Sequence, residues 1–313
     1  MNSEKQPICI FTSDIHLSHK KPICRKEKDW YEYQKDTLSW LSDLCEQEAV
    51  PLIVVGDLFD RPNHPPELIN MAIDNMPYCY CTNGNHDLFG HNRELLHKSA
   101  YGTFIRSEKA TELNKVLPLT DKINLHPYHF GETSGTCNKK DGSYNIALIH
   151  ELVWETEPFK DAPKQGNVEE VVKRFQGFDA IFCGDNHEKF MTEVDGVKVV
   201  NNGSLMRITA KQINYQPSVY ILYDDCSIES VDVPVDDDLI STEHLDSQKD
   251  IKNKIDGFVK NLSEYEKRKL MLDEDGKPFN AYSFEERIQQ AILINEIEVD
   301  VAEIIKEELE KNE

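Results

Sequence analysis

Residues 51–57 of the chain read PLIVVGD, a short apolar run that ends in a glycine and an aspartate. A short apolar run bounded by turn residues predicts a buried strand. Four further runs share this pattern of an apolar stretch that ends in a polar cluster, and they cover residues 8–14, 77–87, 145–150 and 180–187. Helix-like stretches lie between them, over about residues 29–48, 65–75, 91–100 and 167–176. This alternation predicts an α/β sheet with both faces covered.

The five polar clusters follow the carboxyl ends of the predicted strands. Open α/β sheets place their ligand sites at that edge, so clusters that are distant in the sequence are expected to meet in space. After residue 190 the pattern changes to consecutive strands joined by turns, over residues 190–194, 197–201, 218–223 and 228–233. The Asp195-Gly196 pair between the first two predicts a hairpin. We expect these strands to form a second sheet that completes the domain.

The composition of the 313-residue chain excludes several classes of protein. Apolar residues make up 39% and charged residues 29%, with only 14 Gly and 14 Pro, which fits neither collagenous nor wholly disordered chains. No apolar run approaches the roughly 18 residues of a membrane span, so no membrane partner is expected. The start of the chain lacks the pattern of a secretory leader, and the eight cysteines include no C-x2-C pair. We therefore expect a cytoplasmic protein with reduced thiols, located in the host cytoplasm if a phage encodes it.

The net charge of −22 is concentrated toward the end of the chain, because residues 224–313 hold 26 acidic and 11 basic side chains. We predict a catalytic domain over residues 1–235 and an acidic helical region over residues 236–313 that caps this domain or binds a partner. Its last helix, over about residues 283–310, carries one apolar face that packs either on its own domain or on a partner protein. The basic segment over residues 18–28 is expected either to contact phosphate or to be a solvated loop.

Seven residues in the polar clusters are of the types that hold metal ions. They are Asp14, His16, Asp57, Asn85, His150, Asp185 and His187. In an extended segment, side chains two residues apart point to the same side, so Asp14 and His16 can reach one ion, as can Asp185 and His187. Three carboxylates, three imidazoles and one amide suit two divalent ions such as Mn²⁺, Fe²⁺ or Zn²⁺. Two such ions about 3.5–4 Å apart form a clamp for the hydrolysis of a phosphate ester.

The ordered set D-x-H, G-D, G-N-H-D, H and G-x-x-H resembles the calcineurin-like metallophosphoesterase superfamily, over about residues 8–235. The resemblance implies an α/β (α+β) fold, a four-layer α/β/β/α sandwich of two packed sheets flanked by helices, with a small C-terminal helical extension. Residues 56–62, GDLFDRP, and residues 203–207, GSLMR, look like the SbcD branch of double-strand-break repair nucleases. That branch implies a metal-dependent DNA exonuclease or endonuclease subunit of phage or bacterial recombination.

The resemblance also implies a role for each motif residue. One ion would be held by Asp14, His16, Asp57 and His187, and the other by Asp57 as the bridge, Asn85, His150 and Asp185. His86 would protonate the leaving alkoxide or orient the scissile phosphate, and Asp87 would buttress His86. The implied cofactor is two divalent ions, with Mn²⁺ first and Mg²⁺, Fe²⁺ or Zn²⁺ as alternatives.

The chain departs from the family at Asp185, because the family reads G-H-x-H where residues 184–187 read GDNH. A carboxylate in place of a neutral imidazole adds a charge and a harder oxygen donor, which favours Mn²⁺ or Mg²⁺. Alternatively, the second ion site is weakened and the protein is a non-catalytic scaffold of a replication or repair complex. A further alternative is a phosphodiesterase or phosphatase of small phosphate esters on the same fold.

The nuclease hypothesis also names partners. DNA is expected to contact Lys20, Lys21, Arg25, Arg61 and Arg93, and nothing near them specifies bases. An SbcC-like coiled-coil ATPase subunit is implied by the resemblance, and a homodimer is left open. The acidic C-terminal region fits a protein-docking element better than a DNA surface.

Overall fold

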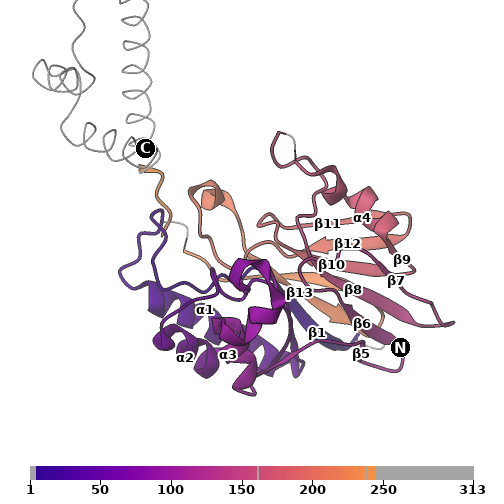
Figure 1. The fold of residues 1–313 in the computed structure, drawn as a ribbon, viewed down its shortest axis with the longest axis horizontal. Coiled ribbons are helices and arrows are strands. Elements are labelled where there is room, and N and C mark those ends of the chain that lie inside the picture. Colours follow the sequence, from indigo (N-terminus) through magenta and orange to yellow (C-terminus); the bar gives the residue numbers. More distant parts are fainter. Residues whose placement is uncertain (1–4, 161, 237–238, 244–313) are drawn as a thin grey trace, which may run out of the picture. The chain divides into compact units, whose positions relative to one another are not determined.

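The computed structural model describes residues 5–160, 162–236 and 239–243 (Figure 1). The chain falls into two compact units, Met1–Ser241 and Thr242–Glu313. Nearly all of the predicted acidic helical region over residues 236–313 lies outside the described residues, including its last helix and the apolar face of that helix. These features remain predictions.

The first sheet has six strands in the order β14-β13-β1-β2-β3-β4. Their bounds are β1 (Pro7–Thr12), β2 (Leu52–Val55), β3 (Cys79–Thr82), β4 (Ala110–Glu112), β13 (Ser218–Tyr223) and β14 (Ile228–Asp232). Strands β1 to β4 run parallel, whereas β13 pairs antiparallel with β1 and β14 pairs antiparallel with β13. The four parallel strands therefore end at one common edge.

The second sheet also has six strands, in the order β11-β12-β10-β8-β6-β5. Their bounds are β5 (Leu117–Pro118), β6 (Ile123–Pro127), β8 (Tyr144–His150), β10 (Ala180–Gly184), β11 (Phe190–Val194) and β12 (Val197–Asn201). Strands β6, β8, β10 and β12 run parallel, and β5 and β11 pair antiparallel at the two edges. A small parallel pair joins β7 (Gly135–Thr136) to β9 (Phe175–Gln176).

The expected membership of the second sheet is wrong in one respect. Strands β13 and β14 do not join β11 and β12, but extend the first sheet beside β1. In β13, Val219 and Ile221 pack into the core under the helices, and Tyr220 and Leu222 pack into the core between the sheets. A strand that is apolar on both faces is best buried within a sheet that is covered on both sides, which the position beside β1 provides.

In the described part of the chain, α-helices cover the outer face of each sheet (Figure 1). The first sheet is covered by α1 (Trp30–Glu48), α2 (Pro66–Asn75) and α3 (Ala100–Arg106), and the second by α4 (Val168–Arg174). Helix α1 begins at Asp29, whose side chain accepts a hydrogen bond from the amide of Glu32, and ends at Ala49 in the left-handed conformation.

The helix expected over residues 91–100 is replaced by two 3₁₀ turns, Phe89–His91 and Arg93–Lys98, and α3 begins only at Ala100. Gly90 takes a φ of 56°, which interrupts the first turn. Ser99 then caps α3 by accepting a hydrogen bond from the amide of Gly102.

Alternation along the strands builds the layers. In β1, Ile10 packs toward the helices, whereas Cys9 and Phe11 pack between the two sheets. Phe11 stacks on Phe182 of β10 at a ring separation of 3.8 Å, which joins the two sheets directly. The four-layer α/β/β/α sandwich is thereby confirmed. No helix of the described residues has the length and apolar character needed to cross a membrane.

Candidate metal centre

The polar clusters of both sheets meet at one edge of the sandwich. Asp14 and His16 follow β1, Asp57 follows β2, Asn85 follows β3, His150 ends β8, and Asp185 and His187 follow β10. The first three strands belong to one sheet and the last two to the other. The predicted convergence therefore occurs, and it occurs across the junction of two sheets.

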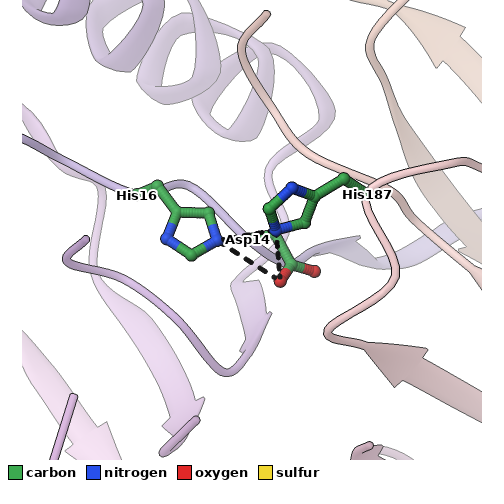
Figure 2. A group of neighbouring side chains, drawn as sticks. All are labelled: Asp14, His16 and His187. Carbon is green, nitrogen blue, oxygen red and sulfur yellow. Dashed lines mark hydrogen bonds and ion pairs between the residues drawn. The ribbon is translucent and has the colours of Figure 1, made fainter. Parts of the chain in front are cut away.

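One group of ligand atoms comes from Asp14, His16 and His187 (Figure 2). The Nε2 atoms of the two imidazoles lie 3.0 Å apart, and they lie 3.7 Å and 3.8 Å from Asp14 Oδ1. Ligands bound to one ion at about 2.1 Å are separated by roughly 3–3.4 Å. Figure 2 shows both rings turned toward the carboxylate, so the three atoms form the triangle that one ion requires.

A second group joins Asp14, Asp57 and His150. Oδ2 of Asp57 lies 3.3 Å from His150 Nε2 and 3.7 Å from His16 Nε2, and His150 Nε2 lies 3.1 Å from Asn85 Oδ1. This Oδ2 is buried and accepts no hydrogen bond. A buried carboxylate oxygen between two donor groups fits an atom that bridges two cations.

The backbone is strained at the same residues. Asp14, His16, Asp57 and Asp185 adopt φ values of 49°, 50°, 52° and 80°. Residues other than glycine rarely adopt this left-handed region, and each costs of order 1–3 kcal/mol. Strain of this kind persists where the surrounding structure fixes the geometry for a functional reason.

Two glycines allow the close packing of the site. A Cβ atom on Gly84 would lie 2.1 Å from Asp57 Oδ1, and one on Gly56, whose φ is 79°, would lie 2.0 Å from His150 Nδ1. Neither gap admits a methyl group. The glycines of the G-D and G-N-H-D motifs therefore leave room for the ligands of the neighbouring strands.

Hydrogen bonds from outside the ligand groups orient the donors. His150 Nδ1 donates to the carbonyl of Val55 at 2.9 Å, which leaves Nε2 bare to face the site. Asp14 accepts from the Ser13 hydroxyl at 2.6 Å and from the Asp185 amide at 3.1 Å. These contacts fix the ligand atoms before any ion binds.

The buried charges act strongly on one another. Burial opposes protonation of His150, but the charges of Asp57 and Asp14 outweigh it and raise the pKa of His150 well above its usual value. Burial also works to raise the pKa of Asp57, but His150 and His16 hold the pKa of this carboxyl well below its usual range. The site therefore attracts positive charge, which a divalent ion supplies in place of protons.

His86 and Asp87 lie beside the metal-binding groups and belong to neither. His86 is exposed, its ring lies edge-on to the His16 ring with 4.9 Å between centroids, and its Nδ1 donates to the Asp60 carbonyl at 2.6 Å. Asp87 is fully buried and accepts from the amides of Phe59 and Gly84. Burial and the charge of Asp57 raise the pKa of Asp87 to about 7. Asp87 thus braces the loops around His86 without a direct contact to its ring.

Asp185 is drawn to the site through its backbone, since its amide donates to both oxygens of Asp14. Its carboxylate is not in either group of mutually close ligand atoms. Burial, opposed by the charge of His150, raises the pKa of Asp185. The carboxylate therefore lies in a partly desolvated place next to the second group.

The residues expected to contact DNA differ in their exposure to solvent. Lys20, Lys21, Arg61 and Arg93 are exposed. Arg25, in contrast, is 4% exposed, pairs with Glu27 at 2.7 Å and stacks over the Tyr33 ring. This placement contradicts the expected contact of Arg25 with DNA, because its guanidinium is buried and bonds to Glu27 and to the carbonyl of Arg207.

Asn201 is a supporting residue that the sequence argument did not identify. It is fully buried at the end of β12, and its side-chain amide donates to the carbonyls of Asn186 and Glu188 at 2.6 Å and 2.7 Å. These carbonyls flank His187. The sequence held a signal, since residues 197–204 read VKVVNNGS, a further apolar run that ends in a polar cluster.

Comparison with known proteins gives a family. A family model described as Calcineurin-like phosphoesterase matches residues 9–189. The comparison with curated proteins returned no match. Among solved structures, a novel archaeal phosphodiesterase is 14% identical with a TM-score of 0.40, covering 72% of this chain and 98% of that chain. A putative 5′-nucleotidase from Staphylococcus aureus, in complex with alpha-ketoglutarate, is 12% identical with a TM-score of 0.43, covering 78% of this chain and 58% of that chain.

Proposed function

The chain belongs to the calcineurin-like phosphoesterase family of metal-dependent hydrolases, and from this premise we propose that it is a di-metal phosphodiesterase that cuts DNA. The observation that carries the proposal is the pair of ligand groups that share Asp14, with Oδ2 of Asp57 lying near His16 of one group and His150 of the other. Their oxygen and nitrogen donors fit two divalent cations of borderline hardness. Such ions supply an activated water and stabilise charge on the phosphoryl oxygens.

The residues of the centre have separate roles in binding the metal ions and in donating a proton. Asp14, His16 and His187 hold one side of the centre, Asn85 and His150 hold the other, and Asp57 joins the two. The Nδ1–H of His86 donates a hydrogen bond to the Asp60 carbonyl, so Nε2 is the ring nitrogen from which a proton can be delivered. We assign that proton to the leaving alkoxide, whose pKa in water lies far above 7.

The assignment to one type of nuclease within the family rests on sequence motifs. The GDLFDRP segment over residues 56–62 supports a nuclease of the SbcD type, acting in recombination or double-strand-break repair with an SbcC-like ATPase subunit and with homodimerisation left open. Exposed Lys20 and Lys21 supply positive charge for the DNA backbone, as do exposed Arg61 and Arg93, which also lie 3.7 Å from Asp60 and 3.3 Å from Glu112. The eight cysteines are free thiols, which supports a reducing compartment such as the cytoplasm. The mixed carboxylate and imidazole donors of the centre fit Mn²⁺, Fe²⁺ or Zn²⁺, and Mn²⁺ is proposed as the resident ion.

The proposal is tested with the metal-reconstituted full chain on linear duplex DNA, single-stranded DNA and bis-p-nitrophenyl phosphate in parallel. Cleavage of DNA that requires Mn²⁺ and is lost in Asp57→Asn supports the proposal. Hydrolysis of the small diester alone indicates an enzyme of small phosphate esters instead. Inactivity on all three substrates with Mn²⁺, Mg²⁺, Fe²⁺ and Zn²⁺, unrescued by an SbcC-like subunit, indicates a scaffold.

A further inference from the structure

We propose that a hollow beside His187 is a nucleoside subsite, in which Phe159 stacks on the base next to the scissile phosphate and Lys211 binds the neighbouring phosphate. This inference rests on the proposed function and specifies the substrate side of the same centre. It assigns a role to two residues that the metal chemistry does not use.

Two hollows flank the metal centre, and Asp185 lines both. One has a volume of about 230 Å³ and includes His150 and Phe130 in its lining. The other has a volume of about 540 Å³ and includes His187, Phe159 and Lys211. Since His150 lines one hollow and His187 lines the other, an ester bound at the centre has room for an organic group toward each hollow. A phosphodiester has two such groups, whereas a monoester has one.

The larger hollow has the volume of a site for a nucleotide-sized ligand. Phe159 is 55% exposed and has no ring partner among the described residues. An exposed aromatic ring at the wall of this hollow offers a face for a base, because every base has a π-face that stacks without sequence preference. Phe159 therefore supplies the apolar contact of the subsite.

The two lysines that line this hollow differ in whether they already form an ion pair. Nζ of Lys189 lies 3.4 Å from Oδ1 of Asp232, so its charge is partly neutralised. Lys211 is exposed and forms no ion pair among the described residues. Glu188 and Asp185 also line the hollow, and their charges repel a phosphate from that side. The phosphate contact is therefore assigned to Lys211, which lines the same hollow as Phe159.

The wall that carries Lys211 is fixed to the metal centre. Lys211 lies in the 3₁₀ turn Ala210–Asn214, which Thr209 and Gln212 close with a capping box. Gln212 donates to the Ser204 hydroxyl at 2.6 Å, and the amide of Ser204 donates to the carbonyl of His187 at 3.3 Å. The backbone of Lys211 is thus held at a set place relative to a metal ligand, which leaves only the side chain to be ordered on binding.

The wall that carries Phe159 is tied to the centre at its base. Asn186, the neighbour of His187, donates to the carbonyl of Val153 at 2.8 Å. Trp154 closes the loop by backbone pairing with Gly166. Both walls therefore meet the loop that presents His187, and a nucleoside between them would lie beside that ligand.

The subsite is tested by kinetics on matched esters with Mn²⁺. The substrates are the 5′- and 3′-(p-nitrophenyl phosphate) esters of thymidine and methyl p-nitrophenyl phosphate, which has no nucleoside. The wild type should prefer at least one thymidine ester, and both Phe159→Ala and Phe159→Leu should reduce that preference about tenfold while sparing the methyl ester. Met191→Ala, which removes an apolar side chain that is 51% exposed on β11 outside the hollow, is the control.

Binding gives a readout independent of hydrolysis. Fluorescence anisotropy of a labelled thymidine tetranucleotide on the metal-free chain should show about five- to tenfold weaker affinity for Lys211→Ala, with a smaller salt dependence. Lys211→Arg should restore affinity, and Lys160→Ala, which removes a nearby exposed charge outside the hollow, should leave it unchanged.

The possible outcomes distinguish failure of the nucleoside subsite from failure of the phosphodiesterase function. If the wild type cleaves diesters but the Phe159 and Lys211 variants keep both the thymidine preference and the oligonucleotide affinity, the subsite is refuted and the phosphodiesterase stands. If no diester is cleaved while affinity still depends on Phe159 and Lys211, the hollow is a nucleotide site and the hydrolytic function fails. If the wild type neither cleaves nor binds, both are overturned.

Discussion

Backbone conformation at single residues connects the strands to the chemistry. Asp14 and Asp57 turn into the left-handed region directly after β1 and β2, at φ values of 49° and 52°. Each turn aims a carboxylate inward from a chain that would otherwise alternate its side chains across the sheet. The free energy of this strain must be met by the hydrogen bonds to the two carboxylates and by whatever cation they hold.

At His86 the structure predicts a loss of rate without loss of metal. His86→Ala should retain two Mn²⁺ per chain, because its ring is in neither ligand group. It should lower kcat on a small diester at least 10²-fold, since it removes the proton donor. His97→Ala, an exposed histidine outside the motifs, is the matched control. Loss of bound Mn²⁺ from His86→Ala, measured by elemental analysis, would show that His86 is a ligand.

At Asp185 the predicted effect depends on metal concentration. If its carboxylate completes the second ion site, Asp185→Asn should lower activity at limiting Mn²⁺ and recover at high Mn²⁺, because the amide is a weaker ligand than a carboxylate. Asp185→His should stay active. Activity and bound Mn²⁺ are measured against Mn²⁺ concentration for each variant. Superimposable curves for the wild type and Asp185→Asn would exclude the carboxylate as a ligand.

At the scale of elements, the end of β12 supports the loop after β10 that carries His187. Asn201 donates two hydrogen bonds to the loop that carries His187. We predict that Asn201→Ala weakens Mn²⁺ affinity about 10- to 100-fold with little change in fold, as is typical when a supporting hydrogen bond behind a ligand is removed. Isothermal titration and circular dichroism measure the two effects.

The matched variant for Asn201 is Asn124→Ala, on β6, where the side chain makes only weak bonds at 3.4 Å. This variant should bind Mn²⁺ as the wild type does. Asn201→Asp provides a stricter test, because it keeps the size of the side chain and removes the donor. Wild-type Mn²⁺ affinity in both Asn201 variants would contradict the role given to β12.

The elements were predictable to different extents. Apolar runs fixed β1, β2, β3, β8 and β10 and the polar residues after them, because a buried strand cannot continue through charged side chains. The position of β13 in the first sheet was not predictable. An apolar run indicates that both faces of a strand are buried, but it does not indicate which strand lies next to it in the sheet. Burial of Arg25 was also missed, because its partners Tyr33 and Arg207 come together only in the folded chain.

On the scale of the whole molecule, the metal centre ties the two sheets together. Its donors follow β1, β2 and β3 of one sheet and β8 and β10 of the other. A cation bound there therefore stabilises the packing of one sheet on the other. Unfolding separates these donors, so the unfolded chain binds the cation only weakly.

We predict that Mn²⁺ raises the melting temperature of the protein. At a free concentration of 100 times Kd, the added stability is about 2.7 kcal/mol, which corresponds to roughly 5–10 °C for a domain of this size. Differential scanning calorimetry with and without EDTA measures the shift. Asp57→Asn, which removes the charge of a carboxylate lying near His16 and His150, should lose most of this shift. Equal melting temperatures with and without Mn²⁺ would show that the centre holds no ion.

The position of β13 beside β1 has a consequence for synthesis of the chain. Ile10 pairs with Ile221, more than 200 residues later, so β1 leaves the ribosome long before the strand that fills its second edge. Contacts between residues so far apart in the sequence form slowly, because the chain loses much conformational entropy before the strand pairing stabilises it. Until then β1 presents an open apolar edge that other strands can join. A nascent or truncated chain that stops short of residue 218 is therefore the form most exposed to aggregation.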